Sequence, residues 1–121
     1  MENLKARELR IGNYLNYNAI RIKLDERIFI SLLSNDGLLL IEKLEPIPLT
    51  EDILLKCGFV KSTIVEGCFI HNKHERLYVS IINPIAIHLG NKNGVLVMLY
   101  YLHTLQNLYF ALTNEELTIK L

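Results

Sequence analysis

The chain has 121 residues, half of them hydrophobic, and its thirteen basic residues balance thirteen acidic ones to a formal net charge of zero. This length suits one domain with a core of its own, so folding requires neither a metal nor a disulfide. The balanced charge argues against binding duplex DNA by charge alone, and no apolar run approaches the roughly 20 residues of a membrane helix.

Short strand patterns fill the first fifty residues. Hydrophobic and polar residues alternate there with the period of a half-buried strand, and the predicted strands cover 12–17, 20–25, 27–33 and 38–41. A polar turn signal at 34–37 separates the last two. The side chains expected in the core are Ile20, Ile22, Leu24, Ile28 and Ile30, with Arg21 and Lys23 facing solvent. With the stretch 45–48, which two prolines hold extended, this makes about five short strands in forty residues and predicts a small SH3-like β-barrel.

A short helix is predicted to follow from Thr50, whose hydroxyl can accept from free amides of the first helical turn. Gly58 can end the helix in the left-handed conformation. Strand patterns then return and predict a four- or five-stranded antiparallel meander over 63–66, 68–71, 77–82, 85–89 and 95–100.

The last predicted element is a helix over 102–112 that ends at Asn114 in the left-handed conformation. Its apolar side is expected to pack on the meander and comprises Met98, Tyr101, Leu102, Leu105, Leu108, Tyr109 and Leu112. The opposite side carries His103, Gln106, Asn107 and Phe110.

These elements predict an α+β fold with two subdomains. The SH3-like barrel occupies residues 1–49, and a helix–meander–helix subdomain occupies residues 50–121. The stretch 45–50 contains two prolines and no flexible spacer, so we expect the subdomains to pack as one rigid unit.

Four residues resemble a zinc site in composition only: Cys57, Cys68, His71 and His74. Their spacing matches no standard finger or ribbon pattern, and strand alternation places Cys68 and His71 on opposite faces. We therefore expect two free, reduced thiols and neither a metal nor another cofactor.

The sequence contains no motif of an enzyme. It has no Gly-x-Ser-x-Gly elbow, and the glycine-containing loop 90–94 lacks the Lys-Ser/Thr ending of a phosphate loop. We therefore expect no catalytic residue, with an enzyme that uses His88 or His103 as the open alternative.

Phe110 stands out because it is an aromatic residue on the polar side of the last helix. Together with His103 and Asn107 it has the composition of an interaction surface for another protein or a second copy of the chain. The alternative is that a loop or the barrel covers Phe110 and makes it a core residue.

A nucleic-acid accessory role is a second alternative. Small barrels bind strands through aromatic and basic side chains, and the candidates here are Tyr14, Tyr17, Arg21 and Lys23. The basic excess in this region is small, so we do not expect nucleic acid to be the main partner.

Four stretches, 9–14, 45–51, 54–59 and 103–117, together resemble a family of small uncharacterised proteins from gut anaerobes and their prophages or other mobile elements. Where those relatives typically have glycine, this chain has Asn114. The resemblance implies an accessory role on a phage or mobile element, and the family has no known activity, ligand or catalytic residue to carry over. Our leading expectation is a cytoplasmic, non-enzymatic interaction module.

Overall fold

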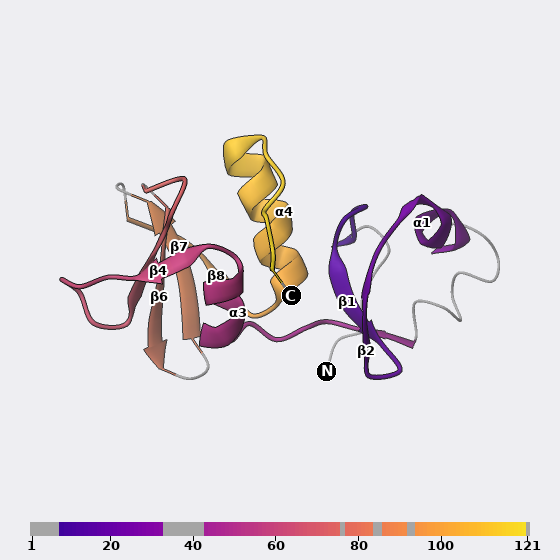
Figure 1. Ribbon diagram of the computed structural model, residues 1–121, viewed down its shortest axis with the longest axis horizontal. Helices are drawn as coiled ribbons and strands as arrows, with labels where there is room; N and C mark the ends of the chain where they lie inside the picture. Colours follow the sequence, from indigo (N-terminus) through magenta and orange to yellow (C-terminus); the bar gives the residue numbers. More distant parts are fainter. Residues whose placement is uncertain (1–7, 33–42, 76, 84–85, 92–93, 121) are drawn as a thin grey trace. The chain divides into compact units, whose positions relative to one another are not determined.

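The computed structural model describes residues 8–32, 43–75, 77–83, 86–91 and 94–120, which form two antiparallel sheets and three helices (Figure 1). In chain order the elements are β1 (Tyr14–Tyr17), β2 (Ile20–Lys23), α1 (Glu26–Leu32), β3 (Leu44–Glu45), α3 (Glu51–Lys56), β4 (Phe59–Lys61), β5 (Cys68–His71), β6 (Tyr78–Asn83), β7 (Ala86–Asn91), β8 (Gly94–Leu99) and α4 (Leu102–Thr113). The predicted α+β class is confirmed. None of the described helices combines the length and the apolar character that crossing a membrane requires.

Contacts divide the chain into two compact units, and each unit is built from two separate stretches of sequence. The first contains residues 1–48 and 101–115, and the second contains residues 49–100 and 116–121. The division after residue 48 lies next to the expected boundary. The helix α4 belongs to the first unit, whereas we expected it in the second subdomain.

The first unit contains a three-stranded antiparallel sheet in the order β2-β1-β3. The hairpin between β1 and β2 turns on Asn18 and Ala19, both with positive φ, as a two-residue hairpin turn requires. One face of the sheet covers a small core of buried leucines, Leu9, Leu15, Leu24 and Leu44. Burial of these side chains is the main stabilising term for so small a sheet.

The predicted SH3-like barrel is not confirmed, because the strand expected over 27–33 is the helix α1 and the described residues form no closed barrel. The side chain of Asp25 accepts a hydrogen bond from the Ile28 amide at 2.9 Å and so caps the start of this helix. Two isoleucines that were expected in the core, Ile20 and Ile30, are 66% and 67% exposed.

Other details of this region follow the prediction. Leu24 is buried, and Arg21 and Lys23 are exposed. The turn expected at 34–37 and the strand expected at 38–41 lie outside the described residues.

The helix α3 begins and ends as predicted. The hydroxyl of Thr50 accepts from the Ile53 amide at 3.2 Å, and Gly58 follows the helix with φ of +90°. A side chain at Gly58 would be strained in this conformation and would also meet His71 and Asn72 at 3.2–3.3 Å.

The second unit contains the predicted meander, a five-stranded antiparallel sheet in the order β4-β5-β6-β7-β8. Its first strand is Phe59–Lys61 rather than the expected 63–66. The hydroxyl of Ser62 accepts from the amides of Ile64 and Val65, so the expected strand is instead a tight turn.

Strand alternation gives this sheet two different faces near its β4 edge. The buried side chains, Phe59 and Phe69 with His71, lie on one face, and Val60 and Ile70 pair across the strands on the other. Figure 1 shows α3 beside this sheet, and its Ile53 and Leu54 are also buried. The unit therefore has a core on one face and leaves Val60 and Ile70 exposed on the other.

Candidate functional site

The helix α4 carries the three residues expected to form an interaction surface, and it begins and ends close to the predicted positions. It spans Leu102–Thr113, and Asn114 ends it with φ of 58°, as predicted. His103 and Gln106 on the expected polar side are almost as deeply buried as Leu105 on the expected apolar side. Leu112, which also belongs to the expected apolar side, is 44% exposed. The helix therefore does not divide into one apolar buried side and one polar exposed side.

The N-terminal segment of the same unit covers the polar side of α4. The side-chain oxygen of Asn107 accepts from Asn13 Nδ2 at 2.8 Å and from Arg10 Nε at 3.2 Å. The amide group of Asn107 donates to the backbone oxygen of Glu8 at 3.0 Å. A single asparagine thus uses both ends of its side chain to bind the segment.

The neighbouring Gln106 acts in the same way one residue earlier. Its Nε2 donates to the Gly12 oxygen at 2.8 Å, and its Oε1 accepts from the Tyr14 amide at 2.8 Å. The backbone at Tyr14 is the start of β1, so Gln106 continues the edge of the sheet with its side chain. We call the four side chains Arg10, Asn13, Gln106 and Asn107 the polar clamp.

The local turn at 10–13 presents these groups to the helix. The Asn13 side chain accepts from the Arg10 amide at 2.7 Å, and the Asn13 amide donates back to the Arg10 oxygen at 3.0 Å. Gly12 within this turn has φ of +98°, which favours glycine. The Arg10 guanidinium lies over the Phe110 ring at 4.6 Å, a cation–π distance.

The structure therefore brings Asn107 and Phe110 together, but against the chain's own N-terminal segment. His103 is also on α4 and is only 3% exposed. Sequence reasoning did not single out Arg10, Asn13 or Gln106 as members of this cluster. No local pattern points to them, because the partners lie more than ninety residues apart in the sequence.

His103 has the features of a buried neutral histidine. Its ring stacks on Tyr101 at 5.9 Å between centroids, and its Nδ1 has no hydrogen-bond partner among the described residues. Burial lowers the pKa of His103, and the charge of Glu8 partly opposes this shift. An imidazole with so little exposure has no access to a substrate, so this geometry does not support a catalytic role.

The cysteine and histidine residues of the second unit form a structural contact. His71 Nε2 lies 3.2 Å from the Cys57 backbone oxygen, and its Nδ1 accepts from the amides of Lys73 and His74 at 3.2 Å each. Both ring nitrogens of His71 are therefore occupied by backbone groups. Its ring also meets Phe59 edge to face at 5.0 Å between centroids.

Cys57 and Cys68 are free cysteines. Burial raises the pKa of Cys57 to about 12. A thiol that stays protonated is neither a nucleophile nor a good metal ligand. Within the described ranges no three histidine, cysteine or acidic side chains form a group that could hold a metal ion.

Among the described residues, a cluster of exposed apolar side chains lies on the hairpin between β4 and β5. Ile64 at its tip is 92% exposed, Val65 is 55% exposed, and Val60 on β4 is 56% exposed. A hollow of about 460 Å³ is lined by these strands and includes Val60, Ile64 and Ile70. We call Val60, Ile64, Val65 and Ile70 the apolar hairpin.

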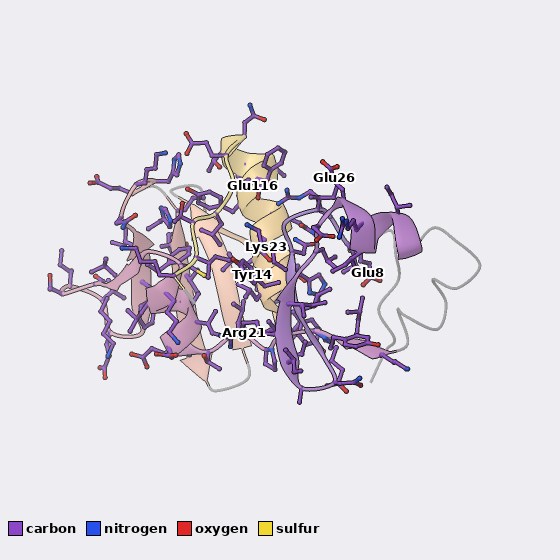
Figure 2. All side chains as sticks on the ribbon, turned by 45° about the vertical axis from the view of Figure 1, so that its right-hand side comes forward. Glu8, Tyr14, Arg21, Lys23, Glu26 and Glu116 are labelled. Atoms are coloured by element: carbon purple, nitrogen blue, oxygen red, sulfur yellow. The ribbon has the colours of Figure 1, made fainter. Side chains whose placement is uncertain are left out.

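The residues named for nucleic-acid binding separate onto two faces of the first sheet. Tyr17 packs against the leucine core. Tyr14 and Lys23 face each other across β1 and β2 on the opposite face, with Arg21 two residues from Lys23. Figure 2 shows Tyr14, Lys23 and Arg21 along one side of these strands.

The alternative catalytic residue His88 is in β7, and its side chain lies outside the described part of the structure. Comparison with protein-family models, with curated proteins and with solved structures gives no match for this chain.

Proposed function

We propose that the protein is a non-enzymatic interaction module and that the apolar hairpin is its contact surface for another protein. The observation that carries the proposal is the concentration of exposed apolar side chains on one hairpin. Four of them lie within eleven residues of sequence, with exposed fractions from 36% at Ile70 to 92% at Ile64. Contiguous exposed apolar surface marks protein contacts more often than isolated exposed residues do.

The position of β4 in the sheet supports an extended segment as the partner. It is the first strand in the order β4-β5-β6-β7-β8 and pairs on one side only within the described residues. The bonds from Asn72 N to Gly58 O and from Ser62 N to Cys68 O show that residues 58 and 62 face β5. Alternation then turns the backbone groups of Phe59 and Lys61 to the outer edge.

The partner that fits this edge is a protein segment that adds as one more strand. Its backbone would pair with Phe59 and Lys61, and its apolar side chains would cover Val60 and Ile64. We propose that the protein is encoded on a phage or mobile element and that this contact serves an accessory role in the cytoplasm. The sequence resemblance supports that role.

Selection from a displayed peptide library against the full-length protein tests the proposal. We expect the selected peptides to alternate apolar and polar residues and to perturb the NMR signals of 59–71. The double variant Val60→Ser/Ile64→Ser should lose this binding. The control Ile20→Ser/Ile30→Ser, which changes two similarly exposed isoleucines of the first unit, should retain it. Peptides that bind the Val60→Ser/Ile64→Ser variant as tightly as wild type would exclude the hairpin.

A further inference from the structure

The strand pair of the first unit has a second face with a different chemistry. Cross-strand pairing places Tyr14 opposite Lys23 and Asn16 opposite Arg21, while Leu15 lies opposite Ile22 between these two pairs. Leu15 is buried in the leucine core. Because side chains alternate along a strand, the remaining four share the face away from this core. We call Tyr14, Asn16, Arg21 and Lys23 the cationic face.

The two cations of this face have no carboxylate partner within the part of the chain that the structure describes. Arg21 and Lys23 are exposed, and neither forms an ion pair with a carboxylate of the described residues. The register places one carboxylate, Glu45, on the same face, on the far side of Asn16. It is two strand spacings from Arg21, about 10 Å. Figure 2 shows Glu26 on the other side of the strands, beside α1.

Tyr14 supplies a ring beside these charges. The Lys23 ammonium lies 5.7 Å from the centroid of the Tyr14 ring, so this ring already receives a cation over its face. The backbone at Tyr14 is fixed by its bond to Gln106 at 2.8 Å. The ring is therefore presented on a strand that α4 holds in place.

We propose that the cationic face binds single-stranded nucleic acid. An unpaired base stacks on Tyr14, and phosphates lie against Arg21 and Lys23, which project from the same side of β2 at alternate positions. Base–aromatic stacking beside a cationic groove is how proteins bind single strands without sequence preference. Two cations are too few to hold a duplex, whose bases are not free to stack. This proposal concerns the first unit and is independent of the apolar hairpin.

Fluorescence anisotropy of the full chain with labelled dT12, U12 and a 12-base-pair duplex tests the proposal. Neutralising two phosphates of a single strand gives a salt slope near −1.4, or a loss of about sevenfold between 50 and 200 mM salt. We expect Arg21→Gln and Lys23→Gln each to reduce the slope by about half. The control Lys61→Gln, which removes the same charge from the second unit, should change nothing.

Stacking is tested separately from charge. Tyr14→Leu should weaken binding of dT12 at least about fivefold, and Tyr14→Phe should keep the wild-type affinity. If Tyr14→Leu lowers the melting temperature, the exposed Arg21 and Lys23 variants carry the test.

Four results would overturn the proposal: no binding of dT12 at 50 mM salt, equal binding by the Gln variants and wild type, tighter binding of the duplex than of dT12, or equal displacement of dT12 by poly-glutamate and by unlabelled dT12. The last result would indicate an acidic protein segment as the ligand.

Discussion

Replacing Asn107 with alanine probes the polar clamp from its α4 side. The substitution removes three side-chain hydrogen bonds, at 2.8, 3.2 and 3.0 Å to Asn13, Arg10 and Glu8. Asn13 is fully buried, so its amide group would be left without this partner in a place that water does not reach. The cost of such an unsatisfied group is about 1–3 kcal/mol, and the other two bonds, one part-buried and one exposed, add less than about 1 kcal/mol each.

One term opposes this loss. Alanine is a better helix former than asparagine by about 0.5 kcal/mol at an interior position of α4. Because neighbouring bonds are not additive, we expect Asn107→Ala to lower the free energy of unfolding by about 2–3 kcal/mol. This is a large share of the 5–15 kcal/mol typical of a domain.

Urea unfolding followed by circular dichroism measures the change. The matched control is Asn16→Ala, since Asn16 is also a partly buried asparagine of this unit and it has no part in the clamp. It should change the free energy of unfolding by less than about 0.5 kcal/mol. An Asn107→Ala variant within about 0.5 kcal/mol of wild type would show that the clamp does not stabilise the fold. The double variant with Asn13→Ala should cost less than the sum of the two single changes, because they share one bond.

Three further predictions concern strain, protonation and thiol reactivity. Ala19 has φ of 65°, so Ala19→Gly should raise the free energy of unfolding by about 0.5–1 kcal/mol, and an unchanged or lower melting temperature would contradict this. Burial lowers the pKa of His103, so folding favours the neutral ring. The stability that this ring contributes is fully present above its ordinary pKa of 6.5 and is lost as the pH falls through the lower pKa of the folded state. The stability of wild type relative to His103→Gln should therefore fall between pH 8 and pH 5 in urea titrations, and a constant difference would refute the assignment. Because burial raises the pKa of Cys57 to about 12, this thiol should react with a thiol reagent at pH 8 only after unfolding. The half-buried Cys68 should react in the native protein. Modification of both cysteines at equal rates in the native protein would contradict the burial of Cys57.

Local chemistry in the sequence predicted the ends of two helices and most of the second sheet. Thr50 caps α3, Gly58 ends it, and Asn114 ends α4, because each acts on backbone groups within a few residues. The meander was predictable for the same reason, since each of its strands pairs with the next one along the chain.

The helix α1 was mispredicted because its isoleucines fit two periods. Ile28 and Ile30 alternate as in a strand, but Ile28 also has the leucine core as a neighbour when the segment is helical. The deciding residue was Asp25, whose side chain caps the Ile28 amide. An aspartate before a glutamate is a start signal for a helix, and it was given too little weight against the alternation.

The covering of α4 could not be predicted from its own sequence. Hydropathy places Gln106 and Asn107 on a polar side, and a polar side is ordinarily solvated. Their partners, Gly12 and Asn13, lie more than ninety residues earlier. Complementary hydrogen bonds between polar residues leave no hydropathy pattern, so only a long-range pairing signal between the two motifs could have indicated the clamp.

The interleaved course of the chain has a consequence for its synthesis. The first unit includes α4, which ends at residue 113. The second unit includes residues 116–121, and the Lys120 amide there donates to the Lys56 oxygen at 2.9 Å. The hairpin of β1 and β2 therefore leaves the ribosome about ninety residues before the helix whose Gln106 extends its edge. During that interval β1 lacks the side-chain bond that Gln106 makes to the Tyr14 amide, while the meander, which depends on sequential pairings, can already form. In a chain that ends at residue 100 and has been released from the ribosome, we expect the meander to resist proteolysis and the N-terminal hairpin to be open to cleavage.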